Sequence, residues 1–122
     1  MSIDKLFEVA ATRQPNHDEI AACCAEHGGG DTDQALNAIA LELARRYDAG
    51  AMSFGDCDVV ANALHSWSIL IKSRELPRPA LDVFSAFDQG EYYHNEDSRD
   101  VDPEAKYTRP AIKEILRARN AV

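Results

Sequence analysis

Carboxylates and tyrosines gather in one segment of the 122-residue chain, from Asp88 to Glu104. It contains seven acidic residues against a single basic one, Arg99, and the run Tyr92-Tyr93-His94 lies inside it. Carboxylates steer a basic partner toward a surface, and tyrosine combines a large contact area with a hydroxyl group. We therefore predict a partner-binding surface made of Asp88, Glu91, Tyr92, Tyr93, His94, Glu96, Asp97, Asp100, Asp102 and Glu104.

Two other interpretations of this segment remain open. It could be a solvated loop whose tyrosines pack back on the core. It could also be a cation site, because Asp100-Val-Asp102-Pro-Glu104 places oxygen ligands at alternate positions. The spacing departs from the EF-hand pattern, since Pro103 interrupts it and the glycine of the sixth loop position is missing.

Other residue types that could do chemistry form no recognised site. Cys23 or Cys24 lies within one helical turn of His27, yet the chain has no Cys-x-x-Cys and no His-Glu-x-x-His. His65 adjoins Ser66, but neighbouring residues on a helix point in different directions, and no Gly-x-Ser-x-Gly occurs. We therefore predict no catalytic, cofactor-binding or metal-binding residue, and we interpret the cysteines as reduced, buried thiols.

The helix that must organise the chain is predicted over residues 53–72. Ser53 and Asp56 form a variant of the capping box at its start. Apolar residues then recur at helical spacing and make a broad stripe. The stripe consists of Val59, Val60, Ala63, Leu64, Trp67, Leu70 and Ile71. Its width is typical of a central, buried helix.

Apolar spacing and cap residues predict the remaining helices. They cover about residues 3–10, 16–27 and 32–48, a segment from Pro79 to the residue before Gly90, and a last helix capped by Thr108. The short link after the third helix makes it an antiparallel neighbour of the central one. No strand pattern occurs, so we predict a single-domain, all-α bundle of about six helices.

The net charge of −8 is unevenly distributed. Residues 1–105 hold 20 acidic and 8 basic residues, whereas residues 106–122 hold 5 basic residues and 1 acidic residue. An acidic surface repels nucleic acid and suits a basic protein partner. No long apolar run predicts a membrane span, and the charged start lacks the apolar centre of a signal peptide. We expect a cytoplasmic protein that binds neither nucleic acid nor membranes.

Two segments carry a resemblance to a known family. The residues LDVFSAFDQGEYYH (81–94) and DPEAKYTRPAI (102–112) resemble small acidic bacterial immunity proteins, the antidotes encoded beside polymorphic or contact-dependent growth-inhibition toxins. The resemblance implies a cytosolic protein that binds one cognate toxin and occludes its active site without catalysis. Many such toxins are nucleases with basic clefts. The alternatives are a helical adaptor or regulatory subunit for another protein, or a small metal-dependent enzyme.

Overall fold

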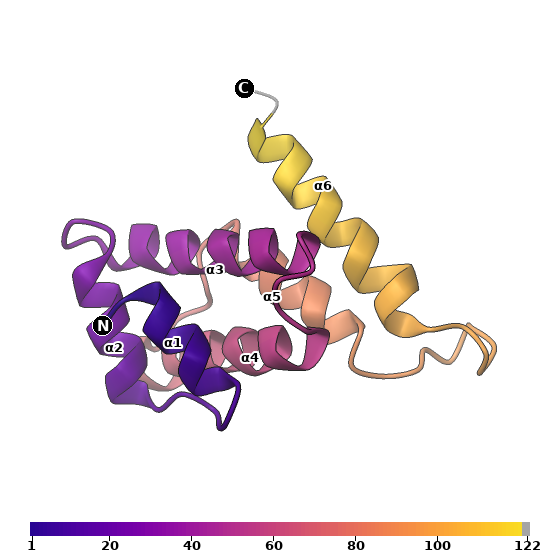
Figure 1. The fold of residues 1–122 in the computed structure, drawn as a ribbon, viewed down its shortest axis with the longest axis horizontal. Helices are drawn as coiled ribbons and strands as arrows, with labels where there is room; N and C mark the ends of the chain where they lie inside the picture. Colours follow the sequence, from indigo (N-terminus) through magenta and orange to yellow (C-terminus); the bar gives the residue numbers. More distant parts are fainter. Residues whose placement is uncertain (121–122) are drawn as a thin grey trace.

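Residues 1–120 are described by a computed structural model, and their regular structure is entirely helical (Figure 1). A π-helical turn, Glu104–Thr108, leads directly into the last helix, and no strand occurs within residues 1–120. The six helices are α1 (Ile3–Ala10), α2 (His17–Glu26), α3 (Thr32–Asp48), α4 (Phe54–Lys72), α5 (Ala80–Gln89) and α6 (Arg109–Asn120). The predicted all-α bundle of six helices is confirmed.

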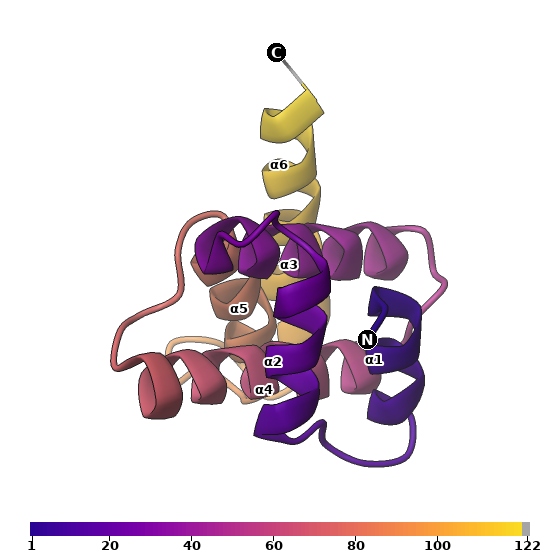
Figure 2. The ribbon, with the colours of Figure 1, turned by 90° about the vertical axis from the view of Figure 1, so that its left-hand side faces the viewer.

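The helices surround a core that α3 and α4 share. These two run antiparallel, as predicted; in Figure 1 α2 lies at their left-hand end, α1 lies in front and α5 lies behind. α4 contacts α1, α2, α3 and α5, while α6 packs on α3 and α5 and then projects beyond the bundle (Figures 1 and 2). Apolar residues from all six helices, among them Leu6, Ile20, Leu43, Leu64, Phe87 and Ile112, are fully buried.

Side-chain caps fix the starts of four helices. Ser2 and Ser53 accept hydrogen bonds from the amides of Lys5 and Asp56, at 3.0 and 3.1 Å. A capping box starts α2, with the Asn16 and Glu19 side chains each accepting a hydrogen bond from the other residue's backbone amide at 2.9 Å. α3 is capped by Asp31. Each such cap contributes about 1 kcal/mol by satisfying an amide that the helix itself leaves free.

The turn between α2 and α3 requires glycine at position 28. Gly28 has a φ of +92°, and a Cβ there would lie 2.6 Å from both the Ala35 nitrogen and the Asp31 oxygen. The backbone of the α3 start therefore approaches too closely for any other residue. This close approach brings α2 and α3 together as neighbours.

The prediction for the central helix is right for most of its length and wrong at its end. Val60, Ala63, Leu64 and Trp67 are buried, but Leu70 and Ile71 are 65% and 53% exposed. The last turn of α4 reaches beyond α3 and α5 in Figure 2, so no helix of the described residues 1–120 covers it. Helical spacing showed which residues share a side of the helix, not where the neighbouring helices end.

Thr108 does not cap the last helix. Its side chain is fully buried, and its hydroxyl donates to the carbonyl oxygen of Ala86 in α5 at 2.6 Å. The helical backbone starts earlier, at Glu104, with the π-helical turn. Thr108 therefore joins the start of α6 to α5, which positions the loop between them.

Candidate partner-binding loop

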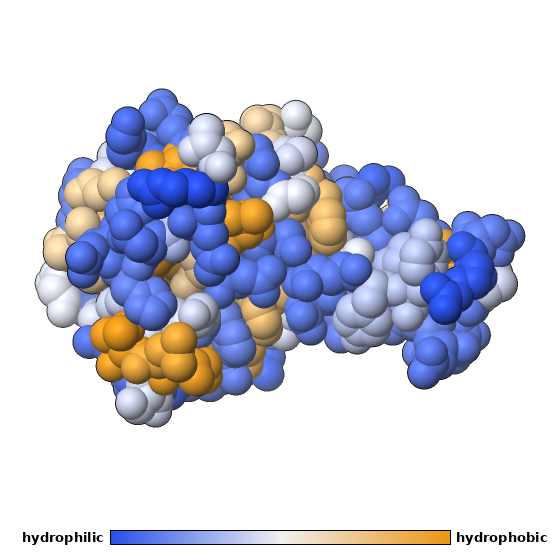
Figure 3. All heavy atoms as spheres, turned by 90° about the horizontal axis from the view of Figure 1, so that it is seen from below, coloured by the Kyte–Doolittle hydropathy of each residue, from blue (hydrophilic) through white to orange (hydrophobic). Residues whose placement is uncertain are grey.

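The acidic loop, residues 90–103, connects α5 to the π-helical turn. In Figure 1 it extends to the far right of the molecule, and Figure 3 shows that end from below as a hydrophilic lobe. It carries most of the residues that the sequence predicted for partner binding. Its ends are close together because Gly90, next to α5, packs against Thr108, next to α6.

An aromatic stack forms the centre of the loop. The His94 ring lies between the rings of Tyr92 and Tyr107, with centroid distances of 4.5 and 3.9 Å. The Nε2 atom of His94 is 2.8 Å from the carbonyl oxygen of Gln89, and it donates because a carbonyl can only accept. Only 7% of the His94 side chain is exposed. His94 is thus an internal support of the loop, and its faces are not available to a partner.

Asp97 is a second internal support. It accepts hydrogen bonds from the Lys106 ammonium group and the Tyr107 hydroxyl, and 10% of its side chain is exposed. These two donors hold the pKa of Asp97 below its ordinary value, since they stabilise the ionised carboxylate. Tyr107 therefore links the stack and the carboxylate, and it ties both to the turn before α6.

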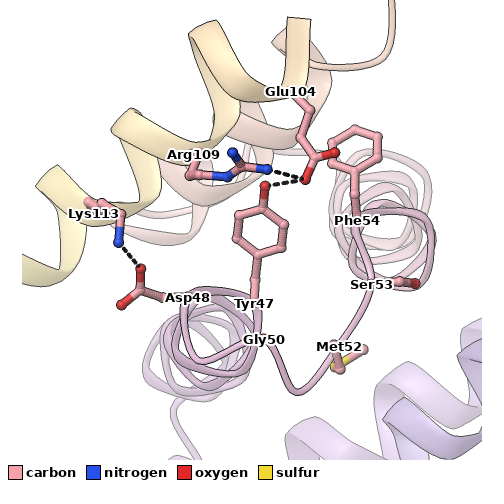
Figure 4. A pocket seen from close by; sticks show the side chains of 9 residues that line it. All are labelled: Tyr47, Asp48, Gly50, Met52, Ser53, Phe54, Glu104, Arg109 and Lys113. Carbon is pink, nitrogen blue, oxygen red and sulfur yellow. Dashed lines mark hydrogen bonds and ion pairs between the residues drawn. The ribbon is translucent and has the colours of Figure 1, made fainter. Parts of the chain in front are cut away.

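Glu104 braces the base of the loop (Figure 4). The Tyr47 hydroxyl at the end of α3 donates to its Oε2 at 2.5 Å, and the Arg109 guanidinium lies 3.6 Å from the same oxygen. Burial and the adjacent carboxylate raise the pKa of Tyr47, so its hydroxyl stays protonated and remains a donor. The Tyr47 ring in turn packs edge-on against Phe87, with centroids 5.2 Å apart.

Tyr47, Glu104 and Arg109 also line a cavity of about 330 Å³ between α3, α4 and α6. Its charged groups pair with one another: besides the contact of Arg109 with Glu104, the Lys113 ammonium is 2.9 Å from an Asp48 oxygen (Figure 4). Tyr47, Met52 and Phe54 supply the apolar part of the wall. We interpret the paired residues that line this cavity as part of the structure that holds α6 and the loop in place.

Three carboxylates meet where the loop leaves α5. Glu91 accepts a hydrogen bond from the Asn62 amide of α4 at 3.2 Å, and Asp58 lies one turn before Asn62 on that helix. The Asp58 Oδ1 atom is buried and has no hydrogen-bond partner within residues 1–120. Burial first, and then its contact with Glu91 and the charges of Glu91 and Asp88, raise the pKa of Asp58 to about 7. Burial and Glu91 also raise the pKa of Asp88, an effect that His65 partly offsets.

Three of these supports were not predicted from the sequence: Tyr47, Asp58 and Tyr107. For Asp58 a signal existed, because Asp58, Asn62 and His65 follow i, i+4 and i+7 and make a polar stripe along α4. Tyr47 follows Leu43 by four residues and so shares the apolar side of α3, and the acceptor of its hydroxyl group lies 57 residues away. No local pattern connects two residues so far apart.

The ten predicted site residues fall into two groups. Four are turned inward or half-buried: Asp88, His94, Asp97 and Glu104. The other six are exposed: Glu91, Tyr92, Tyr93, Glu96, Asp100 and Asp102. Tyr92 and Tyr93 are 48% and 52% exposed, and the Arg99 guanidinium covers one face of the Tyr93 ring at 5.3 Å. The exposed group therefore combines two aromatic rings with carboxylates on one ordered loop.

The cation interpretation finds no converging ligands in this loop. Asp100 accepts from the Ser98 hydroxyl, Asp102 accepts from the Glu104 amide at 3.0 Å, and Glu104 faces Tyr47. Within residues 1–120 no group of three or more His, Cys, Asp or Glu side chains could hold a metal ion. The cysteines are free and buried, and desolvation raises the pKa of Cys23 and Cys24 to about 11 and that of Cys57 to about 12.

Comparison of the chain with protein-family descriptions, curated proteins and solved structures finds no match. No helix within residues 1–120 is both long and apolar enough to cross a membrane.

Proposed function

We propose that this chain is a non-catalytic binding protein that neutralises a basic toxin by covering its active site with the acidic loop. One observation carries the proposal: Tyr92 and Tyr93 are half-exposed beside outward carboxylates, on a loop that its own buried side chains hold in shape. The resemblance of residues 81–94 and 102–112 to bacterial immunity proteins agrees with this role.

An ordered loop favours tight binding because little conformational freedom is lost on association. The stack on His94 and the bonds to Asp97 fix the loop before any partner arrives. The exposed tyrosines supply contact area that loses water in the complex and slows dissociation. The exposed carboxylates, such as Glu96 and Asp100, raise the association rate with a basic surface.

The basic residues of α6 do not neutralise the exposed face of the acidic loop. Arg109 and Lys113 face Glu104 and Asp48 at the base of the loop, and Arg117 pairs with Glu114 within its own helix. These cations are thus engaged away from the exposed face of the loop. A basic cleft of a toxin would meet carboxylates and tyrosines there.

The test is affinity capture from the native host with two variants of equal charge. Glu96→Gln with Asp100→Asn removes two charges from the loop and keeps the acceptor for Ser98. Glu8→Gln with Asp18→Asn removes two exposed charges from α1 and α2, at the other end of the molecule. We expect wild type and the α1–α2 variant to capture one basic protein at near-stoichiometric yield, and the loop variant to lose it.

Toxicity of the captured protein then separates a toxin antidote from an adaptor. Co-expression of this chain should rescue cells that express a captured toxin, and a Tyr92→Ala, Tyr93→Ala variant should fail to rescue them. A captured partner that harms no cell would support the adaptor role instead. Equal capture by the loop variant and wild type would show that the loop is not the binding surface.

A further inference from the structure

The last turn of α4 exposes three consecutive aliphatic side chains at the end of the molecule farthest from the acidic loop. Ile69, Leu70 and Ile71, the aliphatic tip of α4, are 40%, 65% and 53% exposed. Figure 3 shows an orange patch at the lower left, opposite the hydrophilic lobe on the right. Successive helical residues are about 100° apart, so the three side chains surround roughly 200° of the helix. Contiguous exposed apolar surface of this kind marks an interaction site.

Opposite charges stand on the two sides of the aliphatic tip. On the side of α2, the Lys72 ammonium lies 5.7 Å from the Trp67 ring centroid, and within residues 1–120 it forms no ion pair. On the side of α5, a Glu75 oxygen lies 3.0 Å from His65, whose ring stacks on Phe84. The Glu75 side chain is 52% exposed. The tip thus has a cation on one flank and an anion on the other.

We propose that the aliphatic tip of α4, flanked by Lys72 and Glu75, is an interface between two copies of this chain. A two-fold axis that passes between the two charges places each Lys72 opposite Glu75 of the second copy, so the ion pair forms twice. The three aliphatic side chains of each copy meet across the same axis. Such a patch is self-complementary in both charge and apolar character.

The distribution of charge selects a second copy as the occupant. Each copy has a net charge of −8, and the seven carboxylates of residues 88–104 gather at the opposite end. Association through the α4 tips keeps these carboxylates apart, whereas any contact through the loops would bring like charges together. The patch is small beside the ~800 Å² per partner of a standard interface, so the dimer is weak and reversible. This proposal is independent of the toxin-binding role.

The first test compares two substitutions that each add one negative charge at an exposed position. Leu70→Asp changes the centre of the tip, and Tyr93→Asp changes the acidic loop; their side chains are 65% and 52% exposed, so neither change disturbs the core. Sedimentation velocity from about 10 μM to 1 mM covers the range in which a small interface equilibrates. We expect wild type and Tyr93→Asp to dimerise, and Leu70→Asp to associate at least about tenfold more weakly. A wild type that stays monomeric throughout, or a Leu70→Asp variant that dimerises like wild type, would overturn the proposal.

The second test examines the charge pairing itself. Lys72→Glu alone places acids opposite each other across the axis, and Glu75→Lys alone places bases opposite each other, so each variant should dimerise less than wild type. An equimolar mixture of the two variants restores both opposite-charge pairs in a heterodimer. Recovery of dimer in the mixture, but in neither variant alone, supports the two-fold arrangement. A mixture that associates no better than its components would contradict it.

Discussion

The acidic loop and the aliphatic tip of α4 differ in a way that residue type alone does not reveal. The loop is rich in charged residues, yet His94 and Asp97 are almost covered and hold it in one conformation. The tip consists of isoleucine and leucine, yet about half of its surface is exposed to water. A polar sequence can thus form an internal framework, and an apolar one can form a surface, because exposure depends on where the neighbouring elements end.

The two ends should therefore respond differently to substitution. The loop depends on a few specific hydrogen bonds and on one close backbone approach, so small chemical changes should alter its stability or its pH dependence. The tip contributes little to the folded monomer, because its side chains remain in solvent. Substitutions in the two regions test this contrast.

Gly90→Ala should be the most damaging of the substitutions in and around the acidic loop. A Cβ at this position would lie 2.1 Å from the Thr108 hydroxyl oxygen and 3.0 Å from the Phe54 ring. The Thr108 side chain cannot turn away without losing its hydrogen bond to the Ala86 carbonyl oxygen, so α5 and the start of α6 must move apart. We expect a loss of about 2 kcal/mol in the free energy of unfolding, measured by urea titration with circular dichroism.

Gly55→Ala is the matched control. Gly55 lies in the first turn of α4, and an added Cβ there meets no atom within 4 Å. Because alanine favours helix over glycine, the free energy of unfolding should stay the same or rise by up to about 1 kcal/mol. Similar losses for both alanine variants would contradict the close approach at Gly90.

Tyr47→Phe should weaken the base of the loop. The substitution removes the hydroxyl that donates to Glu104 and keeps the ring contact with Phe87. Glu104 retains Arg109 nearby, so we expect a loss of about 1 to 1.5 kcal/mol in the free energy of unfolding. Hydrogen exchange of residues 90–108 should accelerate more than that of α1 and α2. In contrast, Tyr93→Phe alters a half-exposed ring and should change neither quantity.

The sequence predicts much of the fold because local signals are sufficient to place the helices. The caps at Ser2, Asn16 and Ser53, the glycines after α2 and the buried stripe from Val60 to Trp67 are all present. The side chains that support the loop were harder to predict, since the contact of Tyr47 with Glu104 and that of His94 with Tyr107 each join separate segments of the chain. The exposed end of α4 escaped prediction for the same reason: its burial depends on the lengths of other helices.

Asp58→Asn should stabilise the chain at neutral and alkaline pH. The pKa of Asp58 is raised to about 7 in the folded chain, against about 3.9 for an unfolded aspartate. Between these values the folded state holds a proton that the unfolded state releases, so wild-type stability falls as the pH rises through this window. The neutral asparagine avoids this loss. Because the carboxyl is only half-buried, screening by solvent limits the gain to about 1 kcal/mol at pH 8, with little difference near pH 4.

Urea titrations of wild type and Asp58→Asn at several pH values measure this difference directly. All other titrating groups are common to the two proteins, so the difference between the curves isolates the contribution of Asp58. Asp18→Asn, at an exposed position of α2, serves as the control for removal of a carboxylate and should change the free energy of unfolding by no more than about 0.5 kcal/mol. A constant difference across the pH range would contradict the raised pKa of Asp58.

Leu70→Ser should have the smallest effect on the folded monomer, although Leu70 looked like a core residue in the sequence. Its side chain is 65% exposed, so the substitution removes little buried apolar area, and the free energy of unfolding should change by no more than about 0.5 kcal/mol in dilute solution. Leu64→Ser, at a buried position of the same helix, should cost at least about 3 kcal/mol, because it leaves a cavity and buries a hydroxyl. At concentrations where the proposed dimer forms, Leu70→Ser should instead lower the apparent stability, since wild type gains from association by mass action. A substitution that matters only at high concentration would show that these aliphatic residues serve an interface and not the core.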